Sequence, residues 1–170
     1  MRRKLQICTL AIVLLACVYA ASQGTGKPPA AKPAAGSAAQ HFSVAPAELK
    51  WQPLFLGLET AVVSGDPSKP GAPFVLRVRA KTAAVVAAHW HPQDENVTVL
   101  TGTVKLGMGE KYDAKAMQAF ATGSYIFIPK GMRHFVFHGP GSVIQVHGTG
   151  PFVLNFVNPA DDPRTAAPKQ

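Results

Sequence analysis

Four side chains in the middle of the chain have the types and spacing of a metal-ligand set. His89 and His91 are separated by one residue, Glu95 follows shortly after, and His134 lies farther along the chain. Imidazole and carboxylate groups suit Fe(II), Mn, Ni, Cu and Zn alike. Three imidazoles and one carboxylate leave about two positions free on a six-coordinate ion. Such a site can bind water, dioxygen or a chelating substrate, whereas a closed site is structural.

The local sequence predicts how these residues meet. Side chains alternate across a strand, so His89 and His91 share one face with their Cα atoms about 7 Å apart. The Pro-Gln-Asp turn that follows brings Glu95, at the start of the next strand, back beside them. His134 begins a later strand after the turn-forming segment Pro129-Lys-Gly131 and can complete the set from across a barrel.

The glycines and prolines around these residues resemble the two signature motifs of the cupin superfamily. The first motif runs from His89 to Gly102, and the second has Gly123, Pro129, Gly131 and His134 in the family's spacing. The resemblance covers roughly residues 74–158 and implies one divalent transition metal. It also implies the ligands, which are His89, His91, Glu95 and His134.

Three further polar residues are candidates for the wall of a substrate pocket. His138 stands where the family's second motif often has Asn, and it lies about 13 Å along the strand from His134, too far to share its ion. It either lines the pocket and supports the ligands, or ends the barrel with water or a backbone group as partner. Gln145 and His147 share one strand face. They line the pocket if that face points inward and form a surface pair at a sheet edge if it does not.

From residue 42 to residue 159 the sequence predicts one all-β domain. Short apolar runs punctuated by Gly and Pro are typical of a sandwich or barrel, and the resemblance implies a small cupin barrel of the jelly-roll, or double-stranded β-helix, type. A short helix is predicted over Tyr112–Ala119, between the motifs. Strands are expected at Leu58–Val63, Phe74–Ala80, Val85–His91, Glu95–Thr101, Thr103–Met108, Ser124–Pro129, His134–His138, Ser142–His147 and Phe152–Val157.

The N-terminus predicts export. A basic start and an apolar run too short for a membrane span precede Val18-Tyr19-Ala20, which is typical of a signal peptide over residues 1–20 and of a periplasmic or secreted protein. In the alternative interpretation, Leu14-Leu-Ala-Cys17 is a lipobox and a lipid on Cys17 anchors the protein to a membrane. Cys8 and Cys17 both fall in this segment, so a chain cut after Ala20 has no disulfide.

The segments that flank the domain have little to bury. Residues 21–41 are rich in Ala, Pro and Gly, which predicts a flexible linker, and residues 160–170 are expected to form a loose tail. The net charge of +8 is concentrated at the start of the chain. The basic residues of the domain are scattered without interleaved aromatics, so nucleic-acid binding gains no support.

Three functions remain open from the sequence. The first is a metal-dependent enzyme that acts on a small molecule, with chemistry like that of a dioxygenase. The second is a non-catalytic periplasmic protein that binds a metal or a small ligand. The third is a metal-free barrel with a structural or assembly role. Fold and ligand set do not by themselves define the reaction, and the resemblance also implies a homodimer.

Overall fold

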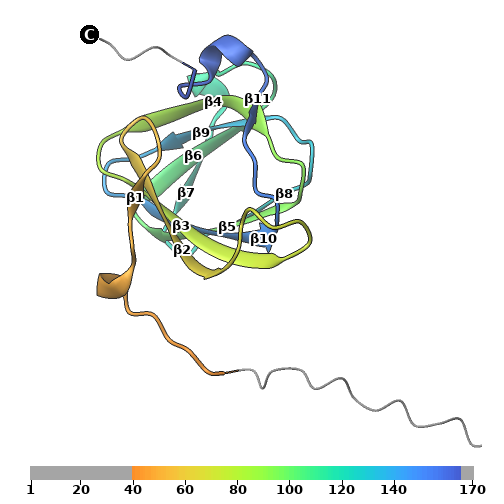
Figure 1. The fold of residues 1–170 in the computed structure, drawn as a ribbon. Helices are drawn as coiled ribbons and strands as arrows, with labels where there is room; N and C mark the ends of the chain where they lie inside the picture. Colours follow the sequence, from red (N-terminus) through yellow and green to blue (C-terminus); the bar gives the residue numbers. More distant parts are fainter. Residues whose placement is uncertain (1–39, 166–170) are drawn as a thin grey trace, which may run out of the picture. The chain divides into compact units, whose positions relative to one another are not determined.

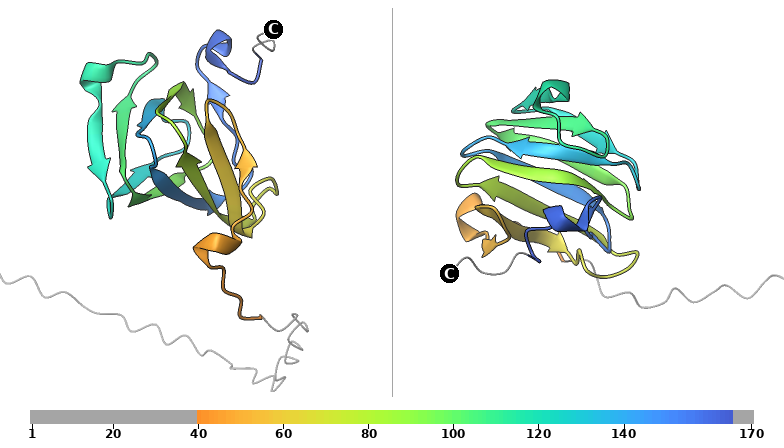
Figure 2. Two further views of the ribbon diagram at one scale, coloured as in Figure 1. Left: turned by 90° about the vertical axis from the view of Figure 1, so that its left-hand side faces the viewer. Right: turned by 90° about the horizontal axis from the view of Figure 1, so that it is seen from above.

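The computed structural model describes residues 40–165, whose strands form two antiparallel sheets that face each other (Figures 1 and 2). The six-stranded sheet contains β1 (Gln52–Pro53), β2 (Leu58–Gly65), β3 (Pro73–Ala80), β10 (Val143–Thr149), β5 (Glu95–Thr101) and β8 (Tyr125–Ile128), in that order. The five-stranded sheet contains β11 (Asn155–Phe156), β4 (Ala84–Trp90), β9 (His134–His138), β6 (Thr103–Met108) and β7 (Gln118–Ala121), in that order. This arrangement confirms the predicted all-β jelly-roll barrel.

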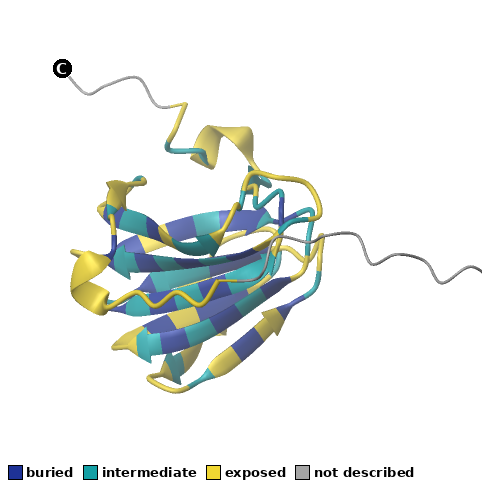
Figure 3. Ribbon diagram, turned by 60° about the horizontal axis from the view of Figure 1, so that its bottom comes forward, coloured by how far each residue is buried: buried dark blue, intermediate teal, exposed yellow. Residues whose placement is uncertain are grey.

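The core lies between the sheets and follows the alternation of the strands. Along β3 every second residue is buried, and β5 buries alternate residues in the same way, as the banded ribbons of Figure 3 show. Each fully buried aliphatic side chain stabilises the fold by about 1.5–3 kcal/mol relative to an exposed one. The buried cluster includes Leu76, Val78, Val97, Val99, Val104, Leu106, Ile144 and Val146.

The short helix predicted between the motifs is present, but it is shorter than the expected range Tyr112–Ala119. Only η2 (Ala114–Ala116) is helical, a 3₁₀ turn that begins where the Asp113 carboxylate accepts a 2.8 Å hydrogen bond from the Lys115 backbone N–H. The residues that follow form β7, because Phe120 pairs with Val104 of β6. Pairing along the sheet therefore outweighs the local helix preference.

The predicted last strand is shorter than expected. Only Asn155 and Phe156 pair with β4. The residues before them bind elsewhere. The Phe152 N–H donates to the Pro67 carbonyl at 2.7 Å, and the Val153 carbonyl accepts a hydrogen bond from the His91 side chain. Two short 3₁₀ turns complete the described elements, η1 (Pro46–Glu48) and η3 (Pro159–Asp161).

Several predictions lie wholly or partly outside the described residues. The signal peptide over residues 1–20, the alternative lipid on Cys17 and most of the linker fall there. Of the predicted tail, Arg164 donates from its guanidinium to the Leu154 carbonyl at 3.0 Å and pairs with Asp162 at 2.7 Å. Within residues 40–165, no helix has the length and apolar character needed to cross a membrane.

Candidate metal centre

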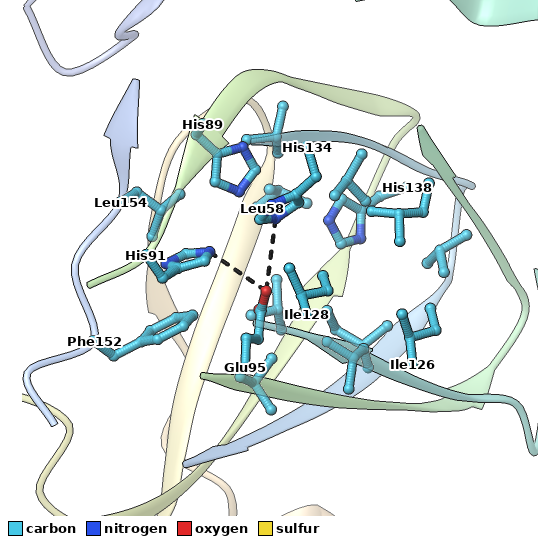
Figure 4. Close-up of a pocket in the computed structure, with 18 of the residues that line it drawn as sticks. Leu58, His89, His91, Glu95, Ile126, Ile128, His134, His138, Phe152 and Leu154 are labelled. Atoms are coloured by element: carbon cyan, nitrogen blue, oxygen red, sulfur yellow. Dashed lines mark ion pairs between the residues drawn. The ribbon is translucent and has the colours of Figure 1, made fainter. Parts of the chain in front are cut away.

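The three histidines predicted as ligands come together inside the barrel. His89, His91 and His134 each offer a ring nitrogen, and these nitrogens lie within 4.8 Å of one another. Their ring centroids are 4.2 to 5.4 Å apart, and all three side chains are buried (Figure 4). Two of them belong to different strands of the five-stranded sheet, His89 to β4 and His134 to β9, while His91 directly follows β4.

A bulge in β4 points the first histidine into the barrel. Val86 pairs with Val136 and His89 pairs with His134, so three residue steps along β4 match two along β9. In a regular strand, residues three positions apart such as Val86 and His89 would lie on opposite faces. Bulges re-aim side chains in this way beside functional sites, and here both residues line the same pocket.

The turns of the two sequence motifs are hydrogen-bonded to each other. The Gly131 N–H donates to the His91 carbonyl at 2.8 Å, and the Lys130 N–H donates to the Asp94 carboxylate at 2.8 Å. These bonds hold the start of β9, and with it His134, beside the turn that follows β4. The convergence therefore has a cause in the backbone as well as in the side chains.

Backbone carbonyls orient all three imidazoles in the same way. A carbonyl oxygen only accepts hydrogen bonds, so each Nδ1 must carry the hydrogen and each Nε2 is left with a free lone pair. Neutral imidazole with an available Nε2 is the form that binds a metal. The partners are Ala87 for His89 at 2.8 Å, Val153 for His91 at 2.8 Å and Met132 for His134 at 3.0 Å.

The carboxyl group of Glu95, the first residue of β5, faces these lone pairs. Its Oε2 atom lies 3.4 Å from Nε2 of His91 and 3.6 Å from Nε2 of His134, the two dashed lines in Figure 4. Burial raises the pKa of Glu95 to about 8. A carboxylate facing two lone pairs needs a cation or a proton between them, so the donor set fits a divalent metal.

The same burial keeps the imidazoles uncharged. Desolvation, with a smaller contribution from the neighbouring His134, lowers the pKa of His89 to about 2 and that of His91 to about 4. Desolvation lowers the pKa of His134 as well. Neutral imidazoles do not have to lose a proton before they bind a metal.

The histidines occupy part of the wall of an otherwise apolar pocket. The cavity has a volume of about 80 Å³, and aliphatic and aromatic side chains from both sheets line the rest of it. A second, largely apolar groove of about 380 Å³ lies beside it, and the two share Leu54, Phe55, Val78, Phe152 and Leu154. Phe152 stacks on His91, with ring centroids 4.5 Å apart and an angle of 12° between the ring planes.

The sequence profile of the ChrR cupin-like domain matches residues 39–153. The chain belongs to this cupin family. The match confirms the resemblance that the two motifs indicated. A comparison with curated proteins gives no match.

Solved structures of other cupins share the fold at low sequence identity. The polyketide cyclase RemF from Streptomyces resistomycificus is 18% identical with a TM-score of 0.59, over 73% of this chain and 90% of RemF. A putative acetylacetone dioxygenase from Methylibium petroleiphilum PM1 is 19% identical with a TM-score of 0.55, over 75% of this chain and 88% of its own. An acetylacetone dioxygenase from Acinetobacter johnsonii is 15% identical with a TM-score of 0.54, over 75% and 83%. At these identities the likeness concerns the fold alone.

Two of the three residues predicted for the pocket wall of this cupin lie elsewhere. Ile144 and Val146 of β10 line the pocket, so the alternate residues Gln145 and His147 lie on the outer face of the sheet. Gln145 accepts a 3.3 Å hydrogen bond there from Nε of Arg77. The prediction that Gln145 and His147 line the pocket is wrong, and the alternative of a surface pair fits the structure.

His138 does line the pocket of the cupin barrel. Its side chain is buried, and its Nδ1 atom has no hydrogen-bond partner among the described residues. Burial lowers the pKa of His138 to about 4, so the ring is neutral. Sequence reasoning missed Phe152 and the Val153 carbonyl, because nothing in the motifs links residues 152–153 to His91.

Proposed function

We propose that this cupin is a divalent-metal-dependent enzyme that acts on a small, largely apolar molecule containing oxygen, with chemistry like that of a dioxygenase. The observation that carries the proposal is the convergence of three neutral imidazoles and a buried carboxyl group on the wall of an apolar pocket. A purely structural barrel would not need four polar side chains buried against one another, since burial of such groups is unfavourable without a partner.

In this proposal His89, His91, His134 and Glu95 hold the metal. When bound, the metal would act as a Lewis acid and would place substrate and dioxygen side by side. The chain's own residues orient the ligands through backbone carbonyls and keep water away with apolar walls. Glu95 would also balance part of the charge of the cation, because it is ionised in the bound state.

The neighbouring structures support the class of substrate. Two of them are named as acetylacetone dioxygenases, one of these as putative. Acetylacetone is a small carbon chain that carries two carbonyl oxygens. A molecule of that kind suits a pocket with apolar walls and a cluster of metal-binding groups.

A second candidate is a non-catalytic protein that binds a metal or a small ligand outside the cytoplasm. The observation that favours it is the cavity volume of about 80 Å³, which leaves little room for a substrate beside dioxygen. The basic and apolar N-terminal sequence is consistent with export, as both candidates would allow.

Elemental analysis of the purified protein, before and after reloading with Fe(II), Mn, Ni, Cu or Zn, tests the metal site. His91→Ala and His134→Ala should lose the ion, while His147→Ala is the matched control because His147 lies on the outer face. We expect close to one equivalent of metal in the wild type and in the control. No metal in the reloaded wild type would contradict the proposal.

Oxygen consumption then separates the two candidates. The metal-loaded protein is given acetylacetone and related small dicarbonyl compounds while dissolved oxygen and product formation are followed. Turnover that is absent in His91→Ala supports the enzyme. Tight binding of metal or dicarbonyl without any turnover supports the binding protein instead.

A further inference from the structure

We propose that His138 is a specificity residue that hydrogen-bonds an oxygen atom of the bound molecule, away from the three clustered histidines. The inference rests on the proposed small-molecule function and identifies the substrate class as one with two separated oxygen groups. It concerns a residue outside the candidate ligand set, so it can fail while the metal site stands.

The position of His138 gives the first argument. It is the last residue of β9, four residues after His134, so the two side chains project from the same face of the strand about 13 Å apart at their Cα atoms. Both line the same cavity, and Figure 4 shows the His138 ring set apart from the three clustered histidines. One molecule in the cavity can therefore contact both places.

The chemistry of the wall gives the second argument. Among the described residues that line the cavity, only the four candidate ligands and His138 are polar. Only 4% of the surface of His138 is exposed, and its Nδ1 atom has no partner among the described residues. An unpaired polar group inside an apolar wall is unfavourable unless something in the cavity binds it.

The protonation state of His138 limits which chemical groups of a bound molecule can be its hydrogen-bond partner. Burial lowers the pKa of His138, so the ring is neutral at physiological pH and offers one N–H donor and one lone pair. A carbonyl or hydroxyl oxygen suits a neutral imidazole, whereas a carboxylate would favour the charged ring. Apolar walls and a volume of about 80 Å³ limit the rest of the molecule to a short carbon chain. The class is therefore a small aliphatic molecule with two carbonyl or hydroxyl groups.

A buried water is the competing partner for His138, because waters commonly satisfy such groups. A water held permanently would make His138 a structural residue with no influence on which molecule binds. The two possibilities differ in what happens when the imidazole is replaced. His138→Leu removes both nitrogens and retains an apolar side chain of moderate size.

The test compares matched ketones on zinc-loaded protein. Pentane-2,4-dione, hexane-2,5-dione and heptane-2,6-dione are each paired with the 2-ketone of the same length, and NMR titration gives the affinities. We expect the best diketone to bind wild type about three- to tenfold more tightly than its ketone, the value of one hydrogen bond. In His138→Leu the ratio should fall to about one, and His138→Gln should retain part of it.

Two further readouts guard against a merely structural effect. The imidazole ¹⁵N resonances of His138 in the wild type should shift when the diketone binds and stay in place with the ketone. The melting temperature of His138→Leu without ligand should equal or exceed that of the wild type, because an unpaired buried polar group has been removed. If the variant does not fold, the shift of the wild-type His138 resonances on diketone binding still tests the inference.

The outcomes are distinct. An equal ratio in wild type and His138→Leu, unmoved His138 resonances, or no preference for any diketone would each overturn the inference and leave a buried water only. Metal content is measured in the same samples. Protein that binds no metal but keeps the His138-dependent preference would contradict the proposed function while the inference stands.

Discussion

The Nδ1 atom of His91 donates a 2.8 Å hydrogen bond to the carbonyl oxygen of Val153, 62 residues later in the chain. The ring of Phe152, the residue before Val153, stacks on the same imidazole. Both residues also line the apolar groove beside the pocket. One segment thus borders the groove and orients a candidate metal ligand, which couples the shape of the groove to the geometry of the site.

Replacing Phe152 with Leu should weaken metal binding. The substitution keeps an apolar side chain but removes the stacked ring that, with the Val153 carbonyl, fixes the orientation of His91. Loss of a group that orients a metal ligand typically lowers metal affinity about tenfold or more. Chelator competition measures the effect, and Phe127→Leu on the exposed outer face is the control. Equal affinities in the two variants would show that the stack has no orienting role.

Metal uptake at pH 7 should release about one proton from Glu95. Burial raises the pKa of Glu95 to about 8, so the metal-free protein carries that proton at pH 7, whereas a bound metal requires the ionised carboxylate. His89 and His91 have pKa values far below 7 and release none. Calorimetry in buffers of different ionisation enthalpy measures the release, and Glu95→Gln should lower it by about one proton per metal. The same release in both proteins would mean that Glu95 does not ionise.

His138 should make the fold less stable in acid. Burial lowers its pKa from 6.5 to about 4, so between these values the unfolded chain holds a proton that the folded chain lacks. The free energy of unfolding therefore keeps its full value above pH 6.5 and decreases as the pH falls toward 4. The shift at His138 accounts for about 3 kcal/mol of this decrease.

Urea unfolding of metal-free protein at pH 7 and pH 4.5 measures this loss. The other buried histidines also have lowered pKa values, so they reduce stability in acid in both the wild type and the variant. A charge on His138 lowers the pKa of His89 slightly further, and only the wild type has this contribution. His138→Leu should therefore lose less stability than the wild type between the two values. An identical loss in both proteins would argue against a buried neutral imidazole at this position.

Gly107 should tolerate no side chain. A Cβ atom at this position would collide with the ring of Phe135, which is fully buried beside His134. We expect Gly107→Ala to reduce the free energy of unfolding by about 1–3 kcal/mol, as overpacked cores do. Gly71→Ala is the control, because its Cβ would meet nothing and only the positive φ of 72° would cost about 1 kcal/mol. A smaller loss at Gly107 than at Gly71 would show that the Phe135 ring can move aside.

Most long strands could be predicted because their signal is local. The apolar alternation of residues 74–80 and 95–101 needs no partner to be recognised, and both segments are strands in the structure. The helix predicted at Tyr112–Ala119 was too long for the opposite reason. Its residues from Gln118 onward become a strand only because β6 lies beside them, and that neighbour is distant in sequence.

The site residues could be found from their spacing, but their surroundings could not. Alternation separates Gln145 and His147 from Ile144 and Val146 without saying which face is inward. The unpaired Nδ1 of His138 depends on what the opposite sheet presents to it. Tertiary packing decides both, so neither was accessible from the motifs.

The extra residue in β4 can be lost without losing the histidine that follows it. Deleting Ala87 or Ala88 would leave Val86 and His89 two positions apart, so both side chains would still share the face that points into the cavity. Families of sequences are usually compared by which residues they share. For this barrel, a relative with a one-residue gap between Val86 and His89 would keep both the fold and the ligand pair, because the gap removes only the bulge.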